Sequence, residues 1–136
     1  MAYWKDTKVK RNYTPHEDEE QASFIQYCAM MASKYKGLDL IYAIPNGGSR
    51  NQLEAQKLKR TGVKAGVPDL FLPVALNGKH GLYIEMKRKE GGRLSEYQKV
   101  WLAKLAEQGY ETAVCHGLDE AIAVVEKYYK GEDNNE

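Results

Sequence analysis

Apolar positions in the first third of the chain recur every three to four residues, which is typical of an amphipathic helix. The pattern predicts a helix from about Thr14 to Lys36, with Phe24 and Cys28 on its apolar face and Gly37 at its end. Later segments alternate between short apolar runs typical of strands and longer helical patterns. The predicted strands cover residues 38–44, 67–75, 81–86 and 110–115, and the other predicted helices cover 51–60, 95–108 and 119–130. The predicted order is therefore α-β-α-β-β-α-β-α without an internal repeat, which indicates one mixed α/β domain.

The two central strands carry the strongest local signal. Asn77-Gly78 lies between the runs at 67–75 and 81–86, and this dipeptide favours a tight turn between antiparallel strands. The two runs are therefore predicted to pair side by side.

Charged residues interrupt these apolar strands. Alternate residues of a strand share a face, so Glu85 and Lys87 point to one side and Met86 to the other. Asp69 on the partner strand can then face Glu85. Two carboxylates beside one lysine can hold a divalent metal ion and position a water molecule, which is the chemistry of phosphodiester cleavage. Each residue alone is also compatible with a solvated strand face or a turn, but the order of Asp, hairpin and Glu-x-Lys favours a site.

The net charge of +1 hides an uneven distribution of charge along the chain. Residues 47–104 contain twelve Lys or Arg against five Asp or Glu, a local net charge of +7. Acidic residues concentrate outside this segment, at 17–20 and 132–136. A basic centre suits a polyanionic partner such as nucleic acid. The basic residues of the helix predicted at 51–60 can equally form an ordinary solvated face.

We expect a flexible arm at residues 1–13, a folded domain at 14–131 and an acidic tail at 132–136. The arm has no apolar run of the signal-peptide kind, and no segment approaches the roughly 20 apolar residues of a membrane span. Cys28 and Cys115 have no Cys or His at a metal-ligand spacing. These features predict a protein of the reducing cytoplasm that does not enter a membrane.

Several short motifs occur together in this chain. They are Glu17 with Gln21, Pro45-Asn46-Gly47-Gly48, the segment 62–69, Glu85-Met86-Lys87, and Leu94-Ser95 with Gln98, Trp101 and Leu105. In these motifs and in its element order the chain closely resembles the VRR-NUC domain of the PD-(D/E)xK nuclease superfamily, in the small stand-alone form carried by phages. The resemblance covers about residues 17–128. The usual Val-Arg-Arg tripeptide is absent, and small phage members do not need it.

The resemblance implies an α/β fold with a restriction-endonuclease-like core (α-β-β-β-α-β), an inserted helix and a C-terminal helix. It also implies that Asp69 and Glu85, with the main-chain carbonyl of Met86, ligate Mg²⁺ or Mn²⁺, which prefer oxygen donors. Lys87 would orient the attacking water and help to stabilise the developing charge. The expected activity is that of a metal-dependent nuclease.

The family pattern adds two catalytic candidates, Glu17 on the first helix and Gln98 on a later helix. Spacing alone favours a structural role for both, because each is the third residue after a Thr or Ser that can cap a helix. The resemblance reverses that preference for Gln98 and, less firmly, for Glu17. Glu20 lies about one helical turn further on and competes with Glu17 as the first-helix acid.

Candidate DNA contacts surround these motifs. Backbone N–H groups at Asn46 and Gly47 could approach a phosphate, although a tight turn explains the glycines equally well. Basic side chains can contact backbone phosphates, which gives affinity without sequence information. The candidates are Arg50, Lys64, Arg88, Lys89 and Arg93. No base-reading module is recognisable, which favours recognition of DNA shape.

Stand-alone members of the resembled family are described as homodimers that cut branched DNA such as Holliday junctions. We therefore expect a homodimer whose partner is branched DNA. A nicking or restriction-like nuclease acting on ordinary duplex DNA is an alternative. A non-catalytic nucleic-acid-binding module is another, although the intact carboxylate and lysine set speaks against it. Tyr3, Trp4, Tyr128 and Tyr129 are candidates for the dimer interface, and packing within one chain explains each of them at least as well.

Overall fold

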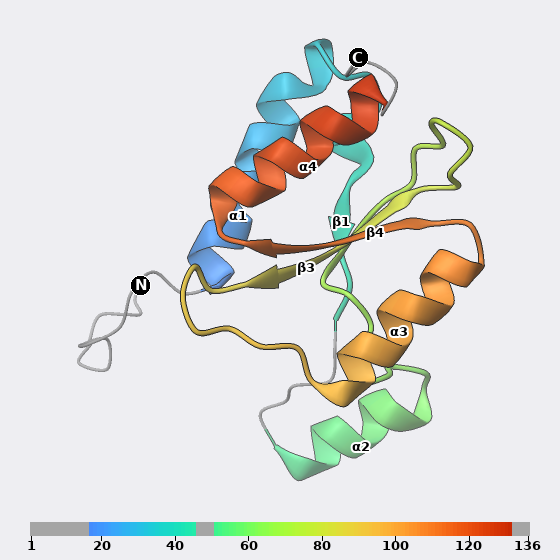
Figure 1. Ribbon diagram of the computed structural model, residues 1–136. Helices are drawn as coiled ribbons and strands as arrows, with labels where there is room; N and C mark the ends of the chain where they lie inside the picture. The colour runs from blue at the N-terminus through green and yellow to red at the C-terminus, as the bar shows by residue number, and fades with distance from the viewer. Residues whose placement is uncertain (1–16, 46–50, 132–136) are drawn as a thin grey trace.

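The computed structural model describes residues 17–45 and 51–131, which form four helices around a four-stranded sheet (Figure 1). The strand order is β1-β2-β3-β4, with β1-β2 and β2-β3 antiparallel and β3-β4 parallel. The helices are α1 (Glu17–Met30), α2 (Gln52–Arg60), α3 (Glu96–Glu107) and α4 (Leu118–Lys130), with 3₁₀ turns η2 (Met31–Ser33) and η3 (Leu38–Leu40). The strands are β1 (Tyr42–Ala43), β2 (Leu70–Leu72), β3 (Leu82–Lys87) and β4 (Glu111–His116). No helix in these residues is long and apolar enough to cross a membrane.

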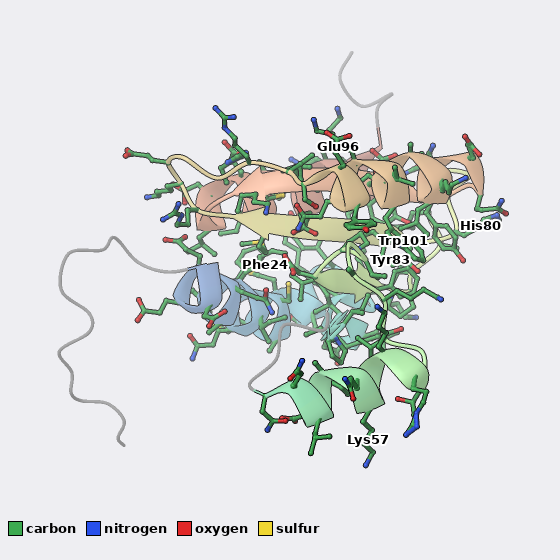
Figure 2. The ribbon with its side chains drawn as sticks, turned by 90° about the horizontal axis from the view of Figure 1, so that it is seen from below. Phe24, Lys57, His80, Tyr83, Glu96 and Trp101 are labelled. Carbon is green, nitrogen blue, oxygen red and sulfur yellow. The ribbon has the colours of Figure 1, made fainter. Side chains whose placement is uncertain are left out.

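The hydrophobic core lies between the sheet and the pair α1 and α4. Phe24 of α1, Val125 of α4 and Ile84 of β3 are all fully buried there. Full burial of such a side chain contributes about 1.5–3 kcal/mol to folding. Helix α3 lies on the opposite side of the sheet (Figure 1), and α2 stands apart from it at the other edge of the molecule (Figure 2). Every residue of α2 is exposed or half-buried, and Lys57 projects away from the body of the molecule (Figure 2).

The predicted fold class and order of helices and strands are confirmed, but several boundaries were wrong. The strand predicted at 67–75 contains only Leu70–Leu72, because Pro68 and Pro73 flank it and proline has no N–H to donate to a neighbouring strand. The strand predicted at 38–44 begins instead with a 3₁₀ turn and pairs only at Tyr42–Ala43.

The ends of the helices also differ from the sequence pattern. Helix α1 stops at Met30 and continues as a 3₁₀ turn, a common way for a helix to end. Helix α3 packs only loosely: its apolar residues Trp101, Leu102 and Leu105 are half-buried, and no residue of α3 is fully buried. The predicted helix start at Thr14, the arm at 1–13 and the tail at 132–136 lie outside the described residues.

The predicted turn between the two central strands is confirmed. Asn77 and Gly78 have φ values of 54° and 80°, and an isolated bridge joins Leu76 to Lys79. Positive φ at both central residues is the backbone of a tight hairpin turn and explains the Asn-Gly pair. Leu70 pairs with Ile84 in the resulting register. The residue before Leu70 is therefore opposite the residue after Ile84, which places Asp69 against Glu85.

Candidate active site

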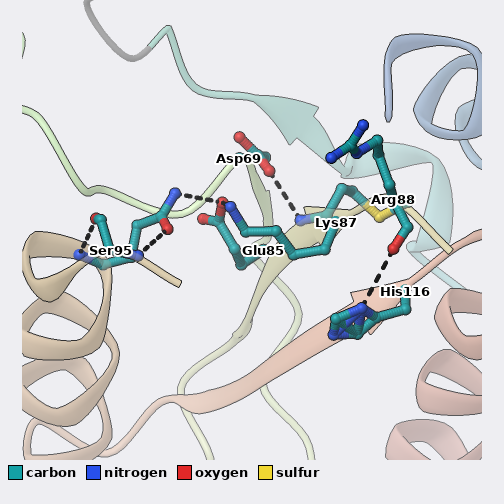
Figure 3. A network of polar contacts seen from close by, with 8 residues as sticks. Asp69, Glu85, Lys87, Arg88, Ser95 and His116 are labelled. Atoms are coloured by element: carbon teal, nitrogen blue, oxygen red, sulfur yellow. Dashed lines mark hydrogen bonds and ion pairs between the residues drawn. The ribbon is translucent and has the colours of Figure 1, made fainter. Parts of the chain in front are cut away.

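Asp69 is held at the start of β2 by contacts on both sides. Its main-chain oxygen accepts a hydrogen bond of 2.8 Å from Ile44 N. Its side-chain Oδ2 accepts a second bond, also of 2.8 Å, from Met86 N on β3 (Figure 3). The carboxylate is therefore tied to the strand that carries Glu85 and Lys87, as the hairpin pattern predicted.

Glu85 and Lys87 share a face of β3, as predicted, and both are buried. Glu85 is 2% exposed and Lys87 is 9% exposed. The Lys87 ammonium Nζ lies 3.8 Å from Glu85 Oε2. A buried charge is costly unless opposite charges and hydrogen bonds compensate it, so these two side chains are unusual occupants of a strand interior.

Gln98 reaches Glu85 from α3. Its Nε2 donates a hydrogen bond of 2.8 Å to Glu85 Oε2. The same side chain closes a capping box with Ser95: Gln98 Oε1 accepts from Ser95 N, and Ser95 Oγ accepts from Gln98 N. The structural and the functional explanations of Gln98 are therefore compatible, because they use opposite ends of one amide.

The approach of α3 to the site depends on Gly66. This residue has φ of +95°, and a Cβ there would lie within 2.7 Å of Tyr97 Cβ and 2.8 Å of the Tyr97 main chain. A side chain at position 66 would be strained and would push α3 outward. Since Tyr97 is the neighbour of Gln98, Gly66 lets the amide reach Glu85.

The electrostatics of the site favour a bound cation. Burial raises the pKa of the Asp69 carboxyl, whereas the Met86 N–H, a hydrogen bond with the Glu85 side chain and the Lys87 ammonium lower that pKa. The nearby charge of Asp18 on α1 adds to the upward shift. Two adjacent carboxyl groups can share a proton or bind a metal ion, and a divalent ion neutralises both.

The donor set suits a hard divalent metal ion. Successive carbonyls of a strand point in opposite directions, and the Lys87 carbonyl accepts from Gly117 N on the β4 side. The Met86 carbonyl therefore points toward Asp69, on the side where Met86 N donates. Asp69, Glu85 and this carbonyl offer only oxygen atoms, which Mg²⁺ and Mn²⁺ prefer. No group of three His, Cys, Asp or Glu side chains suited to a metal is found in the described part of the chain.

The first-helix acids divide between two places. Glu20 was considered as an acid of the cleft, but its Oε1 accepts a 2.7 Å hydrogen bond from Leu118 N at the start of α4. This bond satisfies an N–H group that the helix itself leaves unpaired. Glu17 begins α1, but its side chain is outside what the structure describes. Among the first-helix acids whose side chains the structure describes, Asp18 has a charge that acts on Asp69, and the sequence pattern gave no sign of it.

The predicted DNA contacts are only partly described. Asn46, Gly47 and Arg50 fall outside the described residues. The other four candidates are exposed and stand on connecting segments: Lys64, Arg88, Lys89 and Arg93. Their role in DNA binding stays a prediction.

A cavity of about 560 Å³ lies elsewhere, on the α4 side of the sheet. Lys79, Glu111, Val124 and Lys127 are among its lining residues. None of the site residues lines it, so the carboxylate cluster and not this cavity is the candidate active site.

Comparisons with known proteins point to one family. The model of the VRR-NUC domain family matches residues 3–119. A solved structure described as a VRR_NUC domain protein superposes with a TM-score of 0.74 at 35% sequence identity, covering 87% of this chain and 91% of that chain. No curated protein matches the sequence.

Proposed function

We propose that this chain, which belongs to the VRR-NUC domain family, is a metal-dependent endonuclease that hydrolyses phosphodiester bonds in branched DNA as a homodimer. Membership of the family makes nuclease activity the natural assignment. The observation that carries the proposal is the pair of carboxyl groups, buried Glu85 and half-buried Asp69, with the buried Lys87 beside them. A domain that only bound DNA would have no need to draw two acids and an ammonium group together away from solvent.

The residues have distinct roles in the proposed reaction. Asp69, Glu85 and the Met86 carbonyl would hold Mg²⁺ or Mn²⁺, which when bound lowers the pKa of a coordinated water and neutralises charge on the phosphate. Lys87 orients the attacking water and stabilises negative charge that develops on the phosphate. Gln98 holds Glu85 in place through its 2.8 Å hydrogen bond, as supporting residues do in metal sites.

The preference for branched DNA rests on charge and symmetry. The segment 47–104 is basic, and its exposed cations can follow phosphates without reading bases. Resolving a four-way junction requires cuts in two opposed strands, and one site per chain cannot reach both at once. A two-fold homodimer supplies two symmetric sites and is the commonest assembly of soluble proteins.

The described surface offers apolar side chains for such an assembly. Met30, Leu40 and Tyr42 are 71%, 55% and 52% exposed and stand close together in the sequence. Tyr42 belongs to β1, which is an edge strand of the sheet. Tyr128 and Tyr129 serve the chain's own fold instead, because their hydroxyl groups donate to the Val74 and Lys36 carbonyls. Tyr3 and Trp4 are outside the described residues.

A panel of substrates tests the proposal. The protein is incubated with a four-way junction, a flap, a splayed arm and a plain duplex, each with Mg²⁺, with Mn²⁺ and with EDTA. We expect the metals to support cutting of the junction first, and Asp69→Asn, Glu85→Gln and Lys87→Ala to abolish it while circular dichroism stays unchanged. Equal rates on duplex and junction would favour a nicking or restriction-like enzyme. Binding without cleavage under every condition would leave only a nucleic-acid-binding module.

A further inference from the structure

His116 is the last residue of β4 and has no role in the proposal above. In the parallel pairing of β3 and β4 it is the partner of Lys87. Paired residues of neighbouring strands point to the same face of a sheet. Lys87 shares its face with Glu85, so the imidazole of His116 stands on the active-site face next to Lys87 (Figure 3).

The imidazole contacts the main chain where β3 ends. His116 Nδ1 lies 3.3 Å from the carbonyl oxygen of Arg88, the residue that follows Lys87. A carbonyl oxygen only accepts, so Nδ1 must carry the proton in this contact. Two more bonds fix the surroundings: Gly117 N donates to the Lys87 carbonyl at 3.1 Å, and His116 N donates to Glu120 Oε1 at 2.8 Å.

We propose that His116 is a positioning residue for Lys87, an inference that rests on the proposed nuclease function. Lys87 is the last residue of β3, and an exposed segment containing Gly91 and Gly92 follows it. Its Nζ lies 3.8 Å from Glu85 at the end of a flexible side chain, so its placement depends on the main chain beneath it. The bond from His116 on β4 to the Arg88 carbonyl holds the main chain at the end of β3 from the β4 side, whereas the hydrogen bonds to β2 hold β3 from the other side.

Three substitutions separate this role from others. In His116→Asn the amide Nδ2 can replace Nδ1 as the donor to Arg88. In His116→Gln the amide instead reaches toward the position of Nε2, and His116→Phe keeps a ring without a donor. His80→Ala is the matched control, since His80 lies far along the sheet beside Gly109 and Tyr110.

We expect His116→Phe to lower kcat on the preferred DNA about ten- to a hundredfold with little change in KM, because small misplacements of a catalytic group have effects of that size. In His116→Asn most of kcat should be restored. The kcat of His116→Gln should be as low as that of His116→Phe, and the kcat of His80→Ala should equal that of the wild type. Wild-type kcat in His116→Phe overturns the proposal. Rescue by Gln but not by Asn also overturns it, because it would place Nε2 on the DNA directly.

A measurement without DNA keeps the inference separate from the nuclease assignment. Long-range ¹⁵N–¹H NMR should show a proton on Nδ1 of His116, as the Arg88 contact requires. Amide exchange at Gly117, whose N–H donates to Lys87, should accelerate in His116→Phe and recover in His116→Asn. A proton on Nε2 alone, or unchanged exchange, refutes the positioning role. If both readouts hold and the wild type cuts no DNA, the proposed function fails while the contact stands.

Discussion

Two substitutions in the first turn of α3 separate helix capping from the support of Glu85. Ser95→Ala removes the oxygen that accepts from Gln98 N, but it leaves Gln98 facing Glu85. Gln98→Glu keeps an oxygen that can accept from Ser95 N, because Glu is as good as Gln at this position of a capping box. It replaces the donor to Glu85 by a second carboxylate. Each variant therefore breaks one of the two functions.

The expected magnitudes differ in kind. Loss of the cap should cost about 1 kcal/mol of folding free energy, with a usual range of roughly 0.5–2 kcal/mol. For a chain of this size that lowers Tm by about 3–5 °C per kcal/mol. In Gln98→Glu, two charges placed 2.8 Å apart would repel by about 6 kcal/mol at an effective dielectric constant of about 20, before movement or protonation relieves them. Glu85 then loses its position, and kcat should fall about ten- to a hundredfold.

The assay pairs single-turnover cleavage of the preferred DNA with thermal melting of each variant. Ser95→Ala should melt lower and cut at the wild-type rate per folded molecule. Gln98→Glu should cut slowly although its cap is intact, and Gln98→Ala should show both defects. The reasoning is wrong if Gln98→Glu cuts like the wild type. It is also wrong if Ser95→Ala loses as much activity as Gln98→Glu, which would mean that only the placement of α3 matters.

Three further outcomes follow from the structure. Burial raises the pKa of Asp69, so the stability that this residue contributes is present below the ordinary Asp pKa of about 3.9 and is lost as pH rises above it. In EDTA, Asp69→Asn should therefore raise Tm and flatten the decline of Tm with rising pH. Added Mg²⁺ should raise the Tm of the wild type only. Burial raises the pKa of the Cys28 and Cys115 thiols to about 12, so a thiol reagent at neutral pH should label both only in denaturant, and labelling of folded protein would contradict the buried placement. Light scattering at micromolar concentration should give twice the mass of one chain, and the mass of a single chain would argue against the proposed dimer. Fluorescence anisotropy should show that DNA affinity falls steeply as salt rises, and salt-independent binding would argue against contacts to the phosphates.

The sequence predicted the centre of the site because local rules agree there. Asn77-Gly78 fixes the turn, the turn fixes the register, and the register sets Asp69 against Glu85. Each step depends on residues close in sequence, where backbone preference and strand alternation are strong guides. The family motifs point to the same residues.

Contacts between distant segments could not be predicted in this way. Glu20 and Glu17 look alike on the helix, and only the packing of α1 against α4 brings Glu20 to Leu118 N, 98 positions away. Asp18 near Asp69 and His116 beside Lys87 likewise depend on how α1 and β4 meet the central strands. The parallel pairing of β3 with β4 could have indicated His116, but the length of the connection between them leaves the register open.

Gln98 shows how one residue can carry two signals that spacing cannot separate. A capping box is closed equally well by Glu or Gln, because only an oxygen is needed to accept from the cap residue's N–H. A carboxylate on the facing strand breaks this equivalence. With Gln98 Oε1 occupied by Ser95 N, the remaining atom must donate to Glu85, and only an amide has a donor there. The choice of Gln over Glu at this position therefore indicates that a carboxylate faces the start of the helix. A capping box that is closed by Gln and follows a Glu-x-Lys strand predicts such a contact between the Gln amide and the Glu carboxylate.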